Sequence, residues 1–289
     1  MTFSVLSAAT APGSRINEDA YGVWPDPAAC RAAWVLDGVT GLNDRALLPG
    51  PTDAAWFVAQ VQDLLPALLA EQPAAPAAVL ISTLAHRLEA RQAASWLDAR
   101  GADGRETPAA SFTLVRVLDD AVEIASLGDC LTLVEGHDGA VQVSEHPVLE
   151  EIEATIKRDM QDLRAAGVAS LADVRKRMLP GLHAQRRKRN IPGGYGVLSP
   201  DQACIPMLHV RRLPAAAIRR LLLVSDGYYR LVDHYGAMTD TQLVARTATP
   251  GPAELLRQLR AIEVADPEAV QFPRFKLSDD ATALLLRLA

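Results

Sequence analysis

Three β-rich runs follow one another closely in the middle of this 289-residue chain. They occupy residues 111–117, 121–127 and 131–135, and the breaks between them contain Asp119-Asp120 and Gly128-Asp129. Connections this short suit strands that pair antiparallel with their neighbours. The runs therefore predict an antiparallel meander, which a fourth run at residues 140–143 extends after a turn that contains two glycines.

The rest of the chain shows both helical and strand-like patterns. Apolar residues such as Trp56, Val61 and Leu65 recur at helical spacing over residues 53–71 and 77–100, which predicts two long helices. Strands are expected at 1–7, 32–36, 207–213, 219–224 and 281–288, and shorter helices at 239–247 and 252–264. This order predicts an α+β fold in which helices cover antiparallel sheets.

Composition and charge narrow the class of protein. Apolar residues make up 49% and charged residues 22% of the chain, which is usual for globular proteins and argues against a disordered or fibrous chain. The net charge of −6 and the lack of interleaved basic and aromatic residues predict no nucleic-acid partner. No 18 apolar residues run together, and Cys30, Cys130 and Cys204 are widely spaced, so we expect a cytoplasmic protein without a membrane partner.

Residues 144–200 differ from the rest in charge. They carry ten Lys and Arg against seven Asp and Glu, whereas the remainder of the chain is strongly acidic. This contrast predicts one domain over residues 1–289 with an inserted helical subdomain at 144–200. The segment 175–189 has no acidic residue and includes Arg186, Arg187 and Arg189. These side chains either form a solvated helix face or attract the phosphate groups of anionic substrates.

Acidic residues gather where four strands or strand-like runs end. The four places are Asn17-Glu18-Asp19-Ala20, Val35-Leu36-Asp37-Gly38, Val224-Ser225-Asp226-Gly227 and Ser278-Asp279-Asp280-Ala281-Thr282. An Asp-Gly step alone is often a plain turn, but four such places together favour a common site. Converging carboxylates repel one another unless divalent cations neutralise them. Oxygen ligands suit Mg²⁺ or Mn²⁺, and two such ions can activate water for attack on a phosphoester.

Six short motifs in a fixed order point to a known family. They are Asn17-Glu18-Asp19-Ala20, Asp37-Gly38-Val39-Thr40-Gly41, Ala110-Ser111-Phe112-Thr113, Leu127-Gly128-Asp129-Cys130, Ser225-Asp226-Gly227-Tyr228 and Asp279-Asp280-Ala281-Thr282. In these motifs the chain resembles the PPM or PP2C-type metal-dependent serine/threonine protein phosphatases. The resemblance implies a sandwich of two antiparallel β-sheets flanked by helical pairs (αββα), with a helical flap insertion. It also implies a binuclear Mn²⁺ or Mg²⁺ centre, possible binding of a third ion, and a phosphorylated protein as substrate.

The resemblance implies a role for each acidic position. Asp37 would bridge two metals as the central catalytic carboxylate, and Gly38 would offer its backbone carbonyl to one of them. The other implied ligands are Asp226 and Asp279 for the first metal, Asp19 and, through water, Glu18 for the second, and Asp129 for a weaker third. Asp280 stands where many relatives have Asn, so it could exchange with Asp279 as ligand.

The chain departs from the family pattern at two functional positions. The arginine that binds phosphate in the family would fall on Ser14, so Arg15, one residue later, either takes that role or is a solvated loop residue. Val39 replaces the histidine that can protonate the leaving group. These departures leave two alternatives open beside a phosphoprotein phosphatase. One is a catalytically weak or inactive binding module, and the other is a phosphatase for small metabolites.

Overall fold

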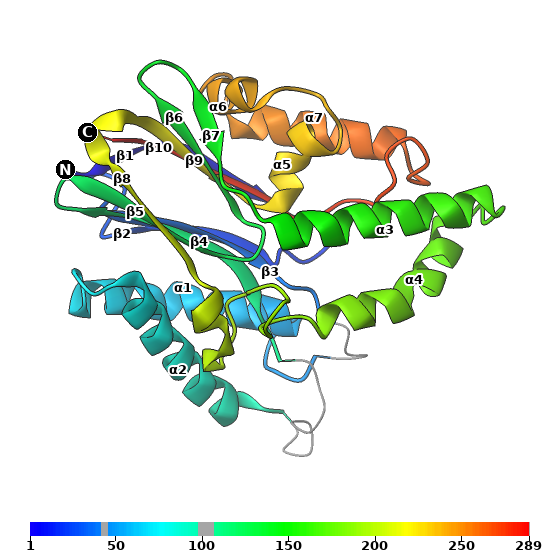
Figure 1. Ribbon diagram of the computed structural model, residues 1–289, viewed down its shortest axis with the longest axis horizontal. Coiled ribbons are helices and arrows are strands. Elements are labelled where there is room, and N and C mark those ends of the chain that lie inside the picture. Colours follow the sequence, from blue (N-terminus) through cyan, green and yellow to red (C-terminus); the bar gives the residue numbers. More distant parts are fainter. Residues whose placement is uncertain (42–45, 98–106, 289) are drawn as a thin grey trace.

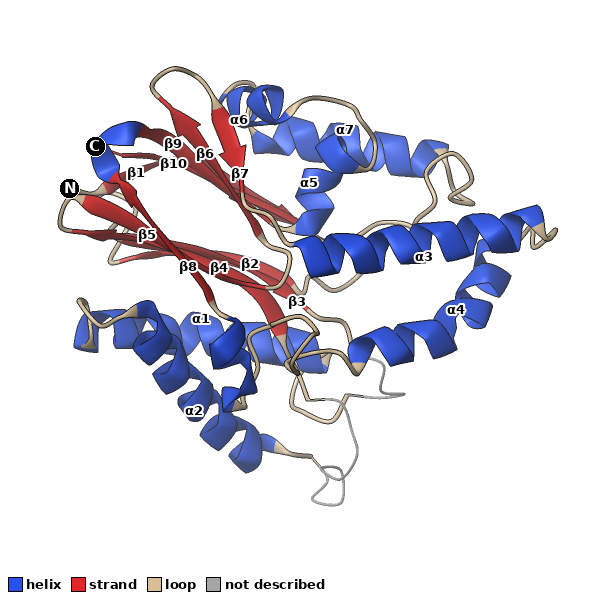
Figure 2. Ribbon diagram, viewed as in Figure 1, coloured by secondary structure: helices blue, strands red, loops and turns tan. Residues whose placement is uncertain are grey.

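The structure is a computed structural model that describes residues 1–41, 46–97 and 107–288. In this part of the chain two antiparallel sheets of five strands each lie face to face, with helices on both outer sides (Figures 1 and 2). The first sheet has the order β1 (Phe3–Ala11), β10 (Ala281–Leu288), β9 (Ile218–Val224), β6 (Leu131–Gly136) and β7 (Val141–Val143). The second has the order β2 (Asp19–Trp24), β3 (Ala32–Gly38), β4 (Ala110–Leu118), β5 (Ala121–Leu127) and β8 (His209–Pro214). The predicted αββα sandwich is confirmed.

Side chains along the central strands point alternately to the two faces of their sheet, and each face contributes to a different apolar layer. On β3, Ala33 and Val35 point into the apolar core between the sheets, whereas Trp34 and Leu36 pack outward against α1 (Asp53–Glu71) and α2 (Ala77–Ser95). On the first sheet, Leu222 of β9 likewise packs outward. Its neighbours there are α5 (Asp226–Asp233), α6 (Asp240–Ala248) and α7 (Pro252–Ala265). The central strands of both sheets are thus buried on two faces, which explains their nearly continuous apolar runs.

The first helix of the outer layer begins and ends where its sequence pattern predicts. Thr52 caps α1 by accepting a hydrogen bond from the backbone N–H of Ala55 at 3.0 Å. The helix then spans the predicted residues 53–71. Its partner α2 ends at Ser95, earlier than predicted, and residues 98–100 of the expected helix lie outside the described residues.

The predicted three-stranded meander is wrong in its third strand. β4 and β5 form a hairpin, but β6 leaves the second sheet and pairs with β7 and β9 in the first. Gly128 turns the chain between the sheets at a φ of +83°, and an added Cβ there would lie 2.2 Å from the Ser111 hydroxyl. A short Gly-Asp loop therefore serves as a crossover between the two sheets and not as a hairpin turn.

Residues 144–200, the predicted insertion, contain α3 (Pro147–Ala165) and α4 (Leu171–Arg186). Met160, Val174 and Met178 pack these helices together and against Ala269 in the loop before β10. The N–H of Leu171 also donates to Glu268 of that loop at 2.9 Å. The pair lies beyond the ends of the strands, beside α5 (Figure 1). The status of 144–200 as an insertion stays a prediction.

Two 3-10 turns flank β8, at Gln202–Met207 and Ala215–Ala217. Among the described residues, the longest helices are too polar or too short to cross a lipid bilayer.

Candidate metal centre

Two aspartates lie opposite each other on the inner face of the second sheet. Asp19 of β2 pairs with Asp37 of β3, and Asp37 in turn pairs with Ser111 of β4. Residues directly opposite in a sheet point to the same side, and Asp37 is in phase with Val35, which faces the other sheet. The face that forms the apolar core thus becomes acidic at this end of the sandwich.

Three further aspartates reach the same end from the first sheet. Asp226 is the first residue of α5, directly after β9, while Asp129 precedes β6 and Asp279 precedes β10. The strand-end residue Val224 pairs with Leu131 on one side and Ala283 on the other, so the three loops lie at one edge. The Ser111 hydroxyl donates a short hydrogen bond to Asp129, which joins the two groups. The sequence prediction that each acidic residue ends a strand is wrong for Asp19, which begins β2, and for Asp279.

Burial and mutual repulsion shift the pKa values of these carboxyl groups. Burial raises the pKa of Asp19 to about 8, although the nearby hydroxyl groups of Ser225 and Thr282 offset part of the rise. The pKa of Asp37 is raised well above its usual range, first by burial and then by the negative charges around it. Burial and the charge of Asp226 raise the pKa of Asp129 to about 6. The raised pKa values mean that the surrounding protein does not fully stabilise the ionised form of these three carboxyl groups.

Several carboxylate oxygens in the cluster have no partner. Glu18 and Asp19 are each 6% exposed, yet Oε1 of Glu18 and both oxygens of Asp19 accept no hydrogen bond from the described residues. A buried carboxylate without partners is costly, and a bound cation would relieve that cost. These hard oxygen donors suit Mg²⁺ or Mn²⁺. The residues present therefore fit the divalent cations that the sequence analysis implies.

On the other side of the cluster, cationic side chains already partner the carboxylates. Arg230 lies one turn after Asp226 on α5, and its Nη2 contacts Asp226 at 3.3 Å and Asp279 at 2.8 Å. Lys276 Nζ contacts the second oxygen of Asp279 at 2.7 Å. Burial raises the pKa of Asp279, but these two positive charges outweigh it and leave the pKa below its usual range. As they stand, no three His, Cys, Asp or Glu side chains of the described residues are arranged to hold a metal ion together.

Asp280 has a different task from its neighbour. Its two carboxylate oxygens accept hydrogen bonds from the backbone N–H groups of Gly13 at 2.7 Å and Glu18 at 2.6 Å. These bonds close the loop that carries Arg15, whose side chain is exposed. An Asn could not accept both bonds, because its amide nitrogen would face one of the donors.

Comparison with known proteins identifies the family of this chain. A sequence model described as protein phosphatase 2C matches residues 12–261. The chain belongs to the protein phosphatase 2C family. A search of curated protein sequences found no significant match.

Solved structures of bacterial phosphatases share this protein phosphatase 2C fold. The serine/threonine phosphatase PstP/Ppp of Mycobacterium tuberculosis has a TM-score of 0.56 and 15% identity, and the match covers 100% of this chain and 99% of that one. PppA, described as a regulatory component of T6SS in Pseudomonas aeruginosa, has a TM-score of 0.52 and 14% identity, with 99% and 98% covered. Stp1 of Staphylococcus aureus has a TM-score of 0.51 and 13% identity, with 100% and 98% covered.

The glycines of the family motifs allow protein segments to approach one another. A Cβ at Gly38 would lie 2.7 Å from the carbonyl oxygen of Glu18, and one at Gly227 would lie 1.9 Å from that of Asp280. The N–H of Gly38 also donates to the Glu18 carbonyl at 2.9 Å. These contacts bring the motifs around Glu18, Asp37, Asp226 and Asp280 together in one compact site.

The three arginines predicted to collect phosphate differ in their contacts with the described residues, and their role stays a prediction. Arg186, at the end of α4, donates from Nη2 to the Thr40 carbonyl at 3.0 Å. Arg189 donates to the carbonyl and hydroxyl oxygens of Thr107 at 2.9 and 3.1 Å, and Arg187 is exposed. Arg186 thus contacts the loop after Asp37, and Arg189 contacts Thr107.

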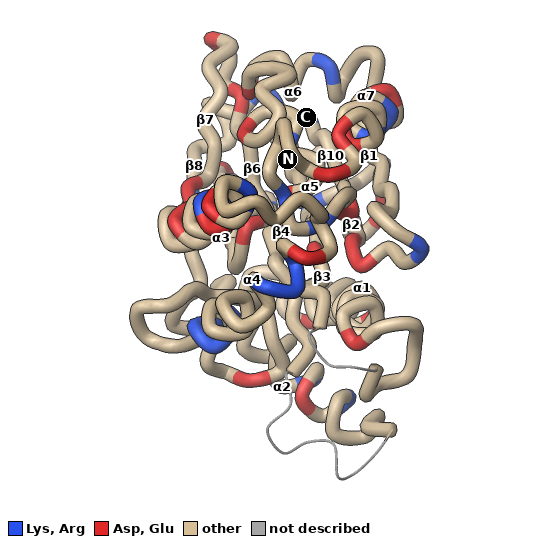
Figure 3. Tube along the Cα trace, turned by 90° about the vertical axis from the view of Figure 1, so that its right-hand side faces the viewer, with Lys and Arg blue, Asp and Glu red and all other residues tan. Residues whose placement is uncertain are grey.

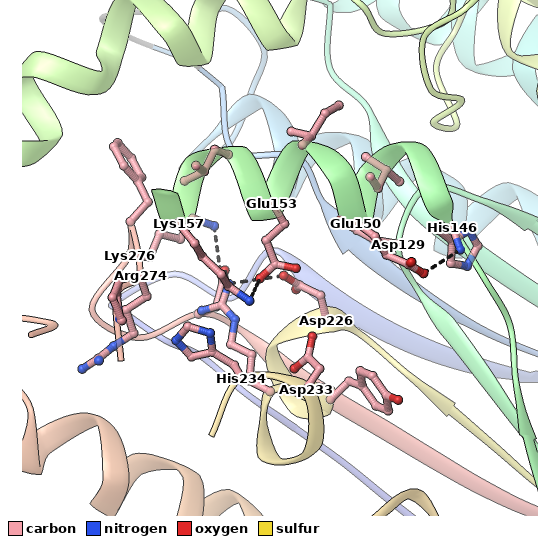
Figure 4. Close-up of a pocket in the computed structure, with 18 of the residues that line it drawn as sticks. Asp129, His146, Glu150, Glu153, Lys157, Asp226, Asp233, His234, Arg274 and Lys276 are labelled. Carbon is pink, nitrogen blue, oxygen red and sulfur yellow. Dashed lines mark hydrogen bonds and ion pairs between the residues drawn. The ribbon is translucent and has the colours of Figure 1, made fainter. Parts of the chain in front are cut away.

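A cavity of about 530 Å³ lies between the acidic centre, α3, α4 and α5. Glu153 of α3 and Asp226 and Asp233 of α5 point into it, with Lys276 at one side (Figure 4). Half-buried apolar residues of α3, such as Leu149 and Ile156, also line it. Viewed from this end of the sandwich, α3 carries positions of both charge signs (Figure 3). The cavity offers a ligand both apolar and charged contacts next to Asp129, Asp226 and Asp279.

The sequence did not predict that Arg230 and Lys276 pair with the carboxylates. It also did not predict the Asp280 clamp, which is the pair of hydrogen bonds that Asp280 accepts from the backbone of Gly13 and Glu18. Thr40, which the sequence analysis names only within a motif, donates from its hydroxyl to Glu18 Oε2 at 2.5 Å. One signal was available for Arg230, because its spacing of four residues from Asp226 places both on one face of a helix. That signal required α5, which the sequence analysis did not predict.

Proposed function

We propose that this chain is a metal-dependent phosphatase of phosphorylated serine and threonine residues in proteins. The observation that supports this most directly is that Glu18 and Asp19, beside Asp37, have buried carboxylate oxygens that accept no hydrogen bond from the described residues, in a member of the protein phosphatase 2C family. Two Mn²⁺ or Mg²⁺ ions bound there would neutralise the carboxylates, lower the pKa of a bound water and polarise the phosphoryl group for direct hydrolysis.

In this proposal the two sides of the cluster supply different ligands. Asp37, which pairs with Asp19 in the second sheet, would be the carboxylate shared by both ions. Asp19, the Gly38 carbonyl and Glu18 would hold one ion, and Asp226 and Asp279 the other, with Asp129 available to a weaker third. Asp280 is not assigned as a ligand, because both its oxygens already accept backbone hydrogen bonds. It instead positions the loop of Arg15, from which the exposed guanidinium can pair with a substrate phosphate.

Two aspartate substitutions test the proposed function. Asp37→Asn and Asp226→Asn should each lower Mn²⁺-dependent hydrolysis of p-nitrophenyl phosphate and of phosphoserine peptides by about 100-fold or more, the scale of losing a preorganised electrostatic group. Asp120→Asn, in the exposed turn between β4 and β5, is the matched control and should retain full activity. Full activity in both site variants would refute the proposal.

The ion pairs of Asp279 favour a second candidate, a binding module with the phosphatase fold and little activity. Arg230 and Lys276 would then permanently replace the cation held by Asp226 and Asp279. Calorimetry with Mn²⁺ separates the candidates, because the module predicts no bound Mn²⁺. A peptide and metabolite panel then distinguishes a phosphoprotein phosphatase from an enzyme acting on small phosphorylated molecules.

A further inference from the structure

The two sides of the acidic cluster differ in how their charge is compensated. On the second-sheet side, Glu18 and Asp19 have three buried oxygens without a hydrogen-bond partner among the described residues. On the first-sheet side, both oxygens of Asp279 are in ion pairs, and one oxygen of Asp226 contacts the same guanidinium. Among the described residues, one side thus has carboxylate oxygens without partners, while the other already holds two cationic groups.

The geometry of Arg230 makes this compensation a built feature of the fold. Its side chain is 14% exposed, and its position on the first turns of α5 directs it to the same edge as Asp226. The guanidinium bridges Asp226 and Asp279, which are 53 residues apart in the sequence but adjacent at the edge of the first sheet. Lys276 approaches Asp279 from the loop before β10. A cation that entered this side would have to separate charge-assisted bonds and approach two positive charges.

We propose that Arg230 and Lys276 are internal counter-ions that make the two cation positions unequal. A divalent cation binds first and more tightly on the side of Glu18, Asp19 and Asp37. The side of Asp226 and Asp279 binds a cation only at a higher cation concentration, after the ion pairs that Arg230 and Lys276 form there have opened. This inference rests on the proposed metal centre and adds an order of loading to it. The chain therefore carries one ion at low Mn²⁺ concentration and two only at high concentration.

Isothermal titration calorimetry of the full chain with Mn²⁺ tests this order without any activity measurement. The wild-type chain should show a tight and a weak class of site, with dissociation constants separated by at least about tenfold, which corresponds to about 1.4 kcal/mol. Arg230→Gln should tighten the weak class by about tenfold and leave the tight class within about twofold. Lys276→Gln, at a more exposed side chain, should act in the same direction and serves as the second variant if Arg230→Gln does not fold.

Two further variants locate the effect. Arg257→Gln removes an arginine of α7 that is 74% exposed and pairs with Glu254, so both binding classes should stay unchanged. Asp19→Asn should remove the tight class and leave the weak one. The order is refuted if wild-type sites are equivalent, if folded Arg230→Gln and Lys276→Gln bind Mn²⁺ as the wild type does, or if Asp19→Asn removes the weak class. Absence of any Mn²⁺ binding by the wild-type chain would instead overturn the proposed function, and this inference with it.

Discussion

Helices α1 and α3 are equally long, at 19 residues each, but they differ in how many of their residues are buried. Ten residues of α1 are buried, and they fill the layer between the second sheet and α2. In α3, which the structure describes throughout, Met160 alone is buried, and part of the remaining apolar surface lines the cavity beside the acidic centre. The contrast teaches that α1 stabilises the sandwich, whereas α3 covers its functional end.

The largest expected effect comes from truncating one apolar side chain in each helix. Leu65→Ala in α1 should lower the free energy of unfolding by about 2–5 kcal/mol, because Leu65 is fully buried. Leu149→Ala in α3 should lower it by less than about 1 kcal/mol, because Leu149 is half-buried at the cavity. Urea unfolding of both variants measures this difference. Equal losses would contradict the division between a stabilising and a covering helix.

The clamp at the functional end should have an intermediate effect. Asp280→Asn should lower the free energy of unfolding by about 1–3 kcal/mol, because one backbone N–H loses its acceptor. It should also raise the KM for a phosphopeptide more than it lowers kcat, since the loop of Arg15 loses its position. A kcat loss without any KM change would argue that Asp280 does not act through this loop.

The acidic end should make the metal-free protein sensitive to pH. Burial raises the pKa of Asp19 from 3.8 to about 8, so between these values the folded chain holds a proton that the unfolded chain has released. Folding then takes up a proton, and the free energy of unfolding should fall by about 1 kcal/mol per pH unit from pH 5 to pH 7. Asp279, whose pKa is lowered, titrates below this range and does not oppose the trend.

Urea unfolding in EDTA at pH 5, 6 and 7 checks this dependence. The Asp19→Asn variant provides the control, because it should show a shallower slope. Stability that does not change with pH in metal-free wild type would contradict the assignment of a buried, proton-holding carboxyl group to this end of the sandwich.

The smallest effect on stability is expected at the end of α4. Arg186→Gln should change the free energy of unfolding by less than about 1 kcal/mol, because its side chain is only half-buried and water can replace the hydrogen bond that it donates to Thr40. The KM for a phosphopeptide should rise several-fold. Arg187→Gln, at the exposed neighbouring position, should raise KM less, and high salt should abolish its effect. Identical KM values for wild type and Arg186→Gln would exclude a substrate role for this residue.

The same contrast explains which features the sequence could predict. The bounds of α1 follow from a wide apolar stripe and the Thr52 cap, both of which are local signals. The sequence analysis did not predict the short helix α5, because the residues Ser225-Asp226-Gly227 are also typical of a turn after a strand. The prediction that β6 continues the meander was wrong, because a short loop can join two strands of one sheet or strands of two different sheets. Here the loop crosses between the sheets where Gly128 lies close to Ser111, a contact that the sequence does not show.

The candidate site was predictable in its carboxylates but not in their partners. Ordered motifs identified Asp19, Asp37, Asp226 and Asp279, which the structure brings to one end of the sandwich. The bond of Arg230 to Asp279 and the clamp of Asp280 on Gly13 and Glu18 join residues far apart in the chain. The clamp, for example, joins positions separated by more than 260 residues. No period or spacing in a single sequence encodes these long-range contacts, whereas Arg230 with Asp226 and Lys276 with Asp279 stand at local spacings.

Thr40 connects the acidic centre with the end of α4. Its hydroxyl holds Glu18 at the acidic centre, and its carbonyl holds Arg186 at the end of α4. These bonds form a short mechanical linkage from the covering helices to a carboxylate of the proposed metal site. A displacement of α4 would therefore pull on Glu18, so the position of the cover and the geometry of the centre are adjusted together.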